Sequence, residues 1–228
     1  MIVFDFFAGT KSSTQAFADA GHTVISFELD ESFDGITEHG NIMDIDAKYL
    51  ITKYGRPDFV WASPPCTAFS VASIGHHWAS GGEFPVPKTE AAVFNQTIVA
   101  HTLNIIRELA PTIGWIMENP VGMLRKLSVV KGLTRNTVTY CQYGETRQKP
   151  TDLWGELPNW SPKMMCKRGA DCHIAAPRGS RTGTQGIKGA KDRSRVPYEL
   201  SMELLNAATM KGMNENVCSS NYLQPTLY

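Results

Sequence analysis

The stretch IVFDFFAGTKSSTQAFADAG, residues 2–21, predicts a strand, a tight turn and a helix in immediate succession. Residues 2–7 form an almost unbroken apolar run, which is typical of a strand buried on both faces of a sheet. Ser12 and Ser13 fit the start of a helix, and Gly21 fits its end. A buried strand followed at once by a helix is half of a βαβ unit, so we expect a parallel sheet covered by helices.

The same alternation continues along the chain. Further strand patterns lie at residues 22–29, 40–45, 58–63, 114–119 and 136–144, and helix patterns at residues 47–54 and 89–109. They predict an α/β fold with a Rossmann-like, doubly wound and mostly parallel sheet, within a domain of residues 1–157. Residues 158–196 lose the periodicity and are rich in Gly, Ser, Arg and Lys, which predicts a short irregular lobe. Residues 197–228 begin with a helix that returns to the first domain and end in a tail.

The net charge of zero hides an uneven distribution. Residues 163–195 contain nine Lys or Arg against two Asp or Glu, whereas the rest of the chain has thirteen against twenty. A basic segment on an acidic body favours a polyanionic partner, and the alternative is a solvated loop. Candidate phosphate contacts in this segment are Arg178, Arg181, Lys188 and Lys191, which lie among glycines.

Targeting and redox signals are few. No apolar run approaches the ~20 residues of a membrane span, and the strand pattern begins almost at the first residue, so we expect a cytoplasmic monomer without membrane contact. The five cysteines are an odd number without the spacing of a disulfide framework, and we expect free thiols or metal ligands. Cys166, Cys172 and His173, with Cys141 as a fourth, are candidate zinc ligands, and free thiols on a loop are the alternative.

Candidate ligand-binding residues follow several strand patterns, because ligands of such sheets bind at the carboxyl ends of the strands. The turn at residues 7–10 brings backbone close to a ligand, and Glu28 lies at the distance along the chain expected of an acid that binds ribose hydroxyls. The alternative is an ordinary strand–helix turn. The candidate cofactor contacts are Phe7, Ala8, Gly9, Thr10, Glu28, Leu29, Asn41, Ile42 and Pro64.

The stretch VWASPPCTAFS, residues 60–70, presents a cysteine directly after two prolines at a strand end. The prolines fix φ and remove two donors, so Cys66 leaves the strand on a rigid turn. Glu118 ends another strand pattern and is expected at the same edge. A thiol beside a carboxyl group is a pair of use in nucleophilic catalysis, whereas an isolated cysteine is often a small core residue.

Together these motifs resemble the cytosine-5 DNA methyltransferases. DFFAG (5–9) is similar to their first cofactor motif, GNI (40–42) to Gly-Asp-Ile, SPPC (63–66) to the catalytic Pro-Cys, ENP (118–120) to Glu-Asn-Val, and ETRQK (145–149) to Gln-x-Arg-x-Arg. The motifs occur in the family order over roughly two thirds of the chain, and the short length is most like phage-encoded members. The resemblance implies the fold of the S-adenosylmethionine-dependent methyltransferases.

The sequence departs from the family pattern at several motif positions. Lys11 and Ser12 replace a glycine pair, Asn41 an Asp, Pro120 a Val, and Glu145 and Lys149 a Gln and an Arg. The family's long target-recognition domain is absent, and only the basic lobe is in its place.

The resemblance implies transfer of a methyl group from S-adenosylmethionine to C5 of a cytosine flipped out of DNA. Cys66 is the implied nucleophile, with a pKa lowered by nearby cations, and Glu118 the acid with a raised pKa that protonates N3. Asn119 is implied to orient the loop, Arg147 to contact O2 of the base or the surroundings of Cys66, and Lys149 to be a weaker substitute for an arginine. The alternatives are an RNA (tRNA) cytosine-5 methyltransferase and a non-catalytic module that binds cofactor and nucleic acid.

Overall fold

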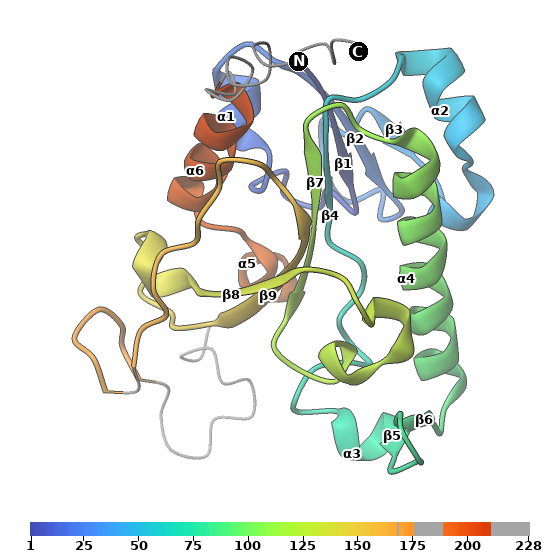
Figure 1. Cartoon of the computed structure of the whole chain (residues 1–228), viewed down its shortest axis with the longest axis vertical. Helices are drawn as coiled ribbons and strands as arrows, with labels where there is room; N and C mark the ends of the chain where they lie inside the picture. The colour runs from blue at the N-terminus through green and yellow to red at the C-terminus, as the bar shows by residue number, and fades with distance from the viewer. Residues whose placement is uncertain (168, 176–188, 211–228) are drawn as a thin grey trace, which may run out of the picture.

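The strand predicted at the start of the chain, β1 (Ile2–Phe6), lies inside a seven-stranded sheet. The computed structural model describes residues 1–167, 169–175 and 189–210, and the strand order is β3-β2-β1-β4-β7-β9-β8 (Figure 1). The other strands are β2 (Thr23–Glu28), β3 (Glu38–His39), β4 (Phe59–Ala62), β7 (Gly114–Pro120), β8 (Arg135–Thr139) and β9 (Pro150–Glu156). The pairs from β3 to β7 are parallel, which confirms the predicted fold class.

Helices cover both faces of the sheet (Figure 1). On one face lie α1 (Gln15–Asp19) and α6 (Tyr198–Thr209), and on the other α2 (Ala47–Tyr54) and α4 (Glu90–Leu109). Each face has its own apolar core: Phe4 packs into the core with α2 and α4, and Val3, its neighbour, packs into the core with α1 and α6. The continuous apolar run of β1 is therefore buried on both sides, as its sequence predicts.

Local signals in the sequence determine where the long helices begin and end. Thr89 accepts a hydrogen bond from the Ala92 N–H at the start of α4, and Asp46 accepts one from the Tyr49 N–H at the start of α2. These side chains satisfy amide groups that a helix start leaves without a partner. Gly55 ends α2 at a φ of +85°, a conformation that favours glycine.

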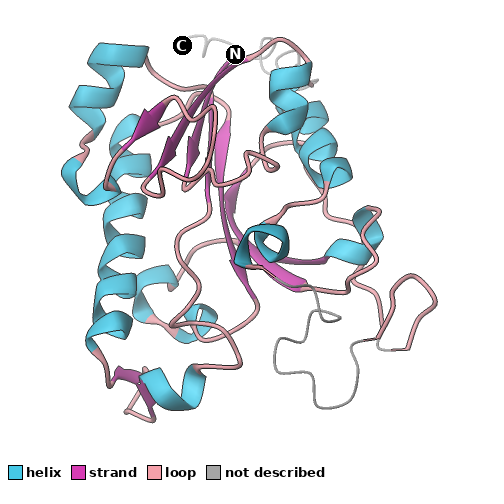
Figure 2. Ribbon diagram, turned by 180° about the vertical axis from the view of Figure 1, so that it is seen from behind, coloured by secondary structure: helices cyan, strands magenta, loops and turns pink. Residues whose placement is uncertain are grey.

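Smaller elements complete the described chain. They are α3 (Ile74–His77), α5 (Ala190–Ser194), the hairpin of β5 (Trp78–Ala79) and β6 (Val86–Pro87), and the 3₁₀ turns η1 (Ile42–Asp44), η2 (Leu124–Lys126), η3 (Ser128–Val130) and η4 (Tyr140–Tyr143). The view from behind shows that the described chain between β9 and α5 is loop (Figure 2). Among the described residues, no helix is long and apolar enough to cross a membrane.

Two strand predictions are wrong, one in kind and one in its bounds, and the strands β3, β5, β6 and β9 were not predicted. Residues 40–45 form η1 instead of a strand, because the Asn41 carbonyl oxygen and side chain accept hydrogen bonds from the turn that follows. The strand predicted at residues 136–144 ends at Thr139, where η4 begins. The missed strand β9 runs antiparallel between β7 and β8. Its buried Asp152 interrupts the apolar pattern by which a core strand is predicted. The Arg125 guanidinium neutralises the Asp152 carboxylate with hydrogen bonds of 2.8 and 2.6 Å.

The ends of residues 158–196 lie against residues of the first 157. The Lys163 N–H donates to the Tyr143 hydroxyl, and the Val196 N–H donates to the Ser12 hydroxyl. The helix predicted after residue 197 packs on α1, where the Ser201 hydroxyl accepts from the Ala16 N–H. Arg178, Arg181 and Lys188 lie outside the described residues, and the predicted domain boundaries stay a prediction.

Candidate functional site

The turn after β1 folds around the carboxylate of Glu28. Glu28 Oε2 accepts from the Gly9 N–H at 2.9 Å, and Oε1 accepts from the Leu29 and Asp30 N–H groups. Gly9 has a φ of +48°, so glycine is favoured at this point of the turn. Phe7 and Lys11 also have positive φ values, 61° and 56°. Strained backbone of this kind is concentrated at ligand-binding turns.

Further cofactor candidates lie beside this turn. Leu29 is 65% exposed directly after Glu28, so an apolar side chain meets solvent next to this carboxylate. Asn41 follows β3, which pairs with the end of β2. Its Oδ1 accepts from the Met43 N–H at the start of η1, where Ile42 is buried. Strand pairing therefore brings these candidates to one edge of the sheet.

Cys66 lies on a tightly bonded turn after β4. The Cys66 carbonyl oxygen accepts from the Phe69 and Ser70 N–H groups, and Cys66 itself is half-buried. Asn119 Nδ2 donates to the Pro64 carbonyl at 2.9 Å from the end of β7. This bond joins the end of β7 to the loop that carries Cys66. Asn119 Oδ1 is buried without a hydrogen-bond partner among the described residues.

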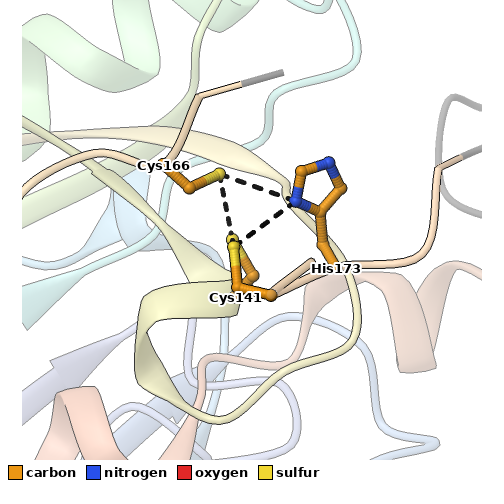
Figure 3. A group of neighbouring side chains, drawn as sticks. Cys141, Cys166 and His173 are labelled. Atoms are coloured by element: carbon orange, nitrogen blue, oxygen red, sulfur yellow. Dashed lines mark hydrogen bonds between the residues drawn. The ribbon is translucent and has the colours of Figure 1, made fainter. Parts of the chain in front are cut away.

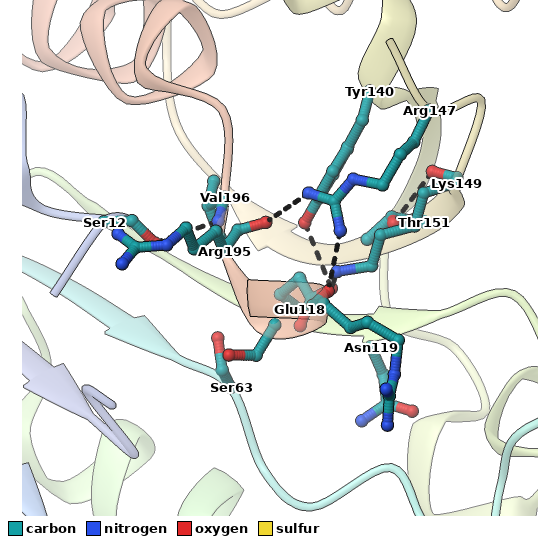
Figure 4. Close-up of polar contacts among 12 residues, drawn as sticks. Ser12, Ser63, Glu118, Asn119, Tyr140, Arg147, Lys149, Thr151, Arg195 and Val196 are labelled. Atoms are coloured by element: carbon teal, nitrogen blue, oxygen red, sulfur yellow. Dashed lines mark hydrogen bonds and ion pairs between the residues drawn. The ribbon is translucent and has the colours of Figure 1, made fainter. Parts of the chain in front are cut away.

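Glu118 stands next to Asn119 at the end of β7 and is buried. Its Oε1 accepts from the Tyr140 hydroxyl at 3.2 Å and lies 3.8 Å from Lys149 Nζ. The Lys149 ammonium lies over the Tyr140 ring, 4.4 Å from its centroid. Figure 4 shows these side chains converging from β7, η4 and the loop before β9. The sequence reading missed Tyr140, whose only signal was a tyrosine at the end of a strand pattern.

Burial controls the acid–base properties of this group. It raises the pKa of Glu118, as expected, and lowers the pKa of Lys149. Burial, followed by the charge of Glu118, also raises the pKa of Tyr140 well above its usual value, so the phenol remains a donor to Glu118.

The expected lowering of the Cys66 pKa is wrong for the chain alone. Burial and then the Glu118 charge raise the pKa of the Cys66 thiol, and the opposing effects of Lys149 and Arg193 are smaller. Sequence reasoning counted the cations near Cys66 and left out the cost of placing a thiolate in a poorly solvated pocket.

Arg147 is 2% exposed and binds backbone. Its guanidinium donates to Glu145 Oε2 at 2.9 Å and to the carbonyls of Asp192, Arg193 and Arg195 at 3.1–3.4 Å. Figure 4 shows the contact with Arg195. Arg147 therefore joins the loop before β9 to the C-terminal end of α5. This is a positioning contact, whereas the resemblance implies that Arg147 contacts the base or the surroundings of Cys66.

Two other side chains from the sequence reading have defined contacts. Ser12, which replaces a family glycine, accepts from the Val196 N–H at 2.9 Å and so holds the chain that leads into α6. Lys191 Nζ donates to the Ser32 carbonyl and lies 4.2 Å from the centroid of the Phe33 ring. Its assignment to DNA stays a prediction.

A pocket of about 470 Å³ lies away from the side chains around Glu118. Its lining includes Gly114, which begins β7, while Glu118 lies near the other end of the strand. The pocket is therefore separate from the side chains that converge around Glu118.

Comparison with known proteins decides the family. The family model described as C-5 cytosine-specific DNA methylase matches residues 1–136. The chain belongs to this family. It is therefore an enzyme, a DNA (cytosine-5)-methyltransferase, and family and fold together imply S-adenosylmethionine as the methyl donor. The RNA methyltransferase and the non-catalytic module are the less favoured interpretations.

One curated protein and one solved structure are similar to this methyltransferase. It is 27% identical over 227 residues to a "Probable DNA (cytosine-5)-methyltransferase" of Frog virus 3 (isolate Goorha), covering 90% of this chain and 99% of the viral protein. The solved structure of the Entamoeba histolytica methyltransferase EhMeth is similar in fold, with a TM-score of 0.51 and 15% identity. That similarity covers 73% of this chain and 57% of the Entamoeba chain. A phage origin remains a prediction.

Proposed function

We propose that this DNA methyltransferase acts through a covalent bond between Cys66 Sγ and C6 of a cytosine that is flipped out of the DNA. The observation that carries the proposal is the meeting of a half-buried thiol, a buried carboxyl group and a buried ammonium at one sheet edge. Attack at C6 gives C5 the electron density that it lacks in free cytosine. A base inside a duplex cannot be attacked in this way, so flipping is required.

One proton is shared among three groups in this mechanism. The thiol proton of Cys66 passes to the Glu118 carboxylate, and Glu118 gives it to N3 as the S–C6 bond forms. Protonating Glu118 removes the negative charge that raises the Cys66 pKa, so the thiolate and the protonated acid favour each other. Lys149 favours the anionic form of both groups. After C5 has received the methyl group, a base removes the C5 proton as the S–C6 bond breaks, Cys66 leaves as a thiolate, and N3 returns its proton to Glu118.

The residues of the first turn fit S-adenosylmethionine. This cofactor supplies an electrophilic methyl group when it is bound. The Glu28 carboxylate keeps lone pairs that can accept from ribose hydroxyls beyond its three backbone bonds. The exposed Leu29 offers an apolar contact for adenine, and Asn41 Oδ1 retains a lone pair for the adenine amino group. Phe7, Ala8, Gly9, Thr10, Ile42 and Pro64 are proposed to line the same site.

DNA binding is proposed for the basic segment, residues 163–195. Its excess of seven positive charges is matched by an equal negative excess on the rest of the chain. Such a segment attracts phosphates by releasing counterions and positions the duplex without reading bases. The proposed contacts are Arg178, Arg181, Lys188 and Lys191.

A substrate panel tests the function. The purified chain is incubated with S-adenosylmethionine and either duplex DNA, single-stranded DNA or tRNA, and the products are digested and analysed for 5-methylcytosine by mass spectrometry. We expect 5-methylcytosine in DNA and its loss in Cys66→Ala, with Cys218→Ala as the matched control. Modification of tRNA alone would favour an RNA methyltransferase, and normal turnover by Cys66→Ala would exclude the proposed nucleophile.

A further inference from the structure

Four soft ligand atoms meet where β8 ends and the basic segment begins. Cys141 lies in η4 directly after β8, Cys166 follows β9, and Cys172 and His173 come in the next turn. The three sulfur atoms and one imidazole nitrogen all lie within 4.8 Å of one another. Figure 3 shows Cys141, Cys166 and His173 directed toward one point. The methyl-transfer mechanism uses none of these residues.

Three of the four distances between these atoms are close to those around a tetrahedral ion, and the fourth, from Cys141 Sγ to Cys166 Sγ, is about 0.6 Å shorter. A zinc ion with Zn–S bonds of about 2.3 Å and a Zn–N bond of about 2.0 Å separates two sulfurs by about 3.8 Å and sulfur from nitrogen by about 3.5 Å. His173 Nδ1 lies 3.7 Å from Cys166 Sγ and 3.6 Å from Cys172 Sγ. The sulfurs of Cys141 and Cys172 are 3.6 Å apart, and those of Cys141 and Cys166 are 3.2 Å apart.

We propose that Cys141, Cys166, Cys172 and His173 bind one structural Zn²⁺ ion. Four protein ligands close a tetrahedral shell and leave no position for water or substrate, so the site is structural. Three thiolates with one imidazole select a soft or borderline ion and disfavour Mg²⁺ or Ca²⁺. The adjacent Cys172 and His173 are an unusual pair of ligands, and the turn nevertheless brings both to the same point.

Side chains around the ligands support thiolate sulfurs. Gln148 Nε2 lies 3.1 Å from Cys166 Sγ, and Gln142 Nε2 lies 3.3 Å from Cys172 Sγ. Amide N–H groups that donate to ligand atoms orient and stabilise a metal site. Each glutamine contacts a different ligand, and both come from the η4 region rather than from the basic segment itself.

The proposed zinc site also connects the basic segment to the loop that carries Lys149. Gln148 is the neighbour of Lys149, and its carbonyl oxygen accepts from the Tyr140 N–H at 2.8 Å. On the ligand side, the Cys166 N–H donates to the Thr139 hydroxyl at 3.0 Å, close to the strand end that leads to Cys141. A bound ion therefore fixes the first part of the basic segment beside the loop that carries Lys149.

Metal content of the full chain tests the proposal. The chain is produced in zinc-containing medium, purified with a reductant, desalted and analysed by inductively coupled plasma mass spectrometry. We expect about one zinc per chain, as a closed four-ligand site holds one ion. The double variant Cys166→Ser/Cys172→Ser is expected to lose the zinc, and the matched control Cys66→Ser to keep it. Absence of stoichiometric zinc from the unmodified chain, or its retention in the double variant, would overturn the proposal.

A milder variant separates metal binding from folding. Gln148→Ala keeps all four ligands, and we expect a 10- to 100-fold weaker affinity in competition with a chromophoric chelator, the usual effect of losing such a supporting contact. Gln96→Ala on α4 is the control and should match the unmodified chain. Cobalt substitution should give the intense visible absorption of a tetrahedral thiolate site. A weak octahedral cobalt spectrum, or a Cys141–Cys166 disulfide found by non-reducing peptide mapping of the chain purified with a reductant, would contradict the site.

Discussion

Replacing Lys149 by Met should move the whole pH–rate profile of methyl transfer to higher pH. In the proposed mechanism the active form holds one proton on the Cys66–Glu118 pair. A second proton blocks the transfer from the thiol, and loss of the last proton removes the acid for N3. The profile is therefore bell-shaped, with limbs that belong to the pair. The Lys149 cation favours the anionic forms of both groups, so its removal raises both pKa values and shifts both limbs upward.

The distance between Lys149 and Glu118 sets the size of the shift. Nζ and Oε1 are 3.8 Å apart, and the side chains are only 11% and 8% exposed. Two unit charges at this separation interact by roughly 4 kcal/mol at an effective dielectric constant of about 20. Relaxation and water entry reduce this interaction energy. A shift of one pH unit corresponds to about a third of the full 4 kcal/mol. We therefore expect the acid limb to move up by about one pH unit or more.

Single-turnover rates measured from acid to alkaline pH provide the assay, because they isolate chemistry from product release. Lys149→Arg keeps the cation and should restore the original limbs. Lys131→Met removes an exposed lysine that pairs with Glu83 and should leave the profile unchanged. Unmoved limbs in Lys149→Met, with only a uniform loss of rate, would refute the electrostatic role of Lys149.

Three further predictions address the cofactor, the loop and DNA. Glu28→Ala should weaken S-adenosylmethionine binding in calorimetry by about 1–3 kcal/mol, because ribose hydroxyls lose their acceptor, and unchanged affinity would remove Glu28 from the site. Arg147→Ala should lower the free energy of unfolding in urea by about 1–3 kcal/mol, since Glu145 and three partly buried carbonyls lose their hydrogen-bond donor, and a change below about 1 kcal/mol would contradict this role. Arg178→Ala combined with Arg181→Ala should weaken DNA binding and make the slope of log binding constant against log salt concentration shallower by about two units of roughly 0.9 each. Identical slopes for the variant and the unmodified chain would indicate a solvated loop.

The parallel half of the fold was predictable from local sequence. Apolar runs such as residues 2–7 and caps such as Thr89 and Gly55 carry their information within a few residues. The antiparallel strand β9 was not predictable in this way. Its Asp152 is acceptable in the core only because the Arg125 guanidinium, distant in sequence, neutralises it.

The candidate site was also predictable from the sequence only in part. Strand ends and motif order brought Cys66, Glu118 and Asn119 into the prediction, because parallel strands deliver their carboxyl ends to one edge. The pKa of Cys66 depends on burial, which a linear sequence does not express, and the prediction was wrong in sign. The Arg147 contacts to the end of α5 are long-range backbone bonds, which no residue pattern signals.

The most direct test of the central claim is a covalent trap at Cys66. DNA that contains 5-fluorocytosine blocks the final elimination, because fluorine at C5 cannot leave as a proton. With S-adenosylmethionine present, the chain should form a complex with this DNA that survives denaturing electrophoresis, and peptide mass mapping should place the methylated adduct on Cys66. Cys66→Ser should form none, and Cys218→Ser should trap normally. A stable adduct on another residue, or a methylated product without any adduct, would contradict the account.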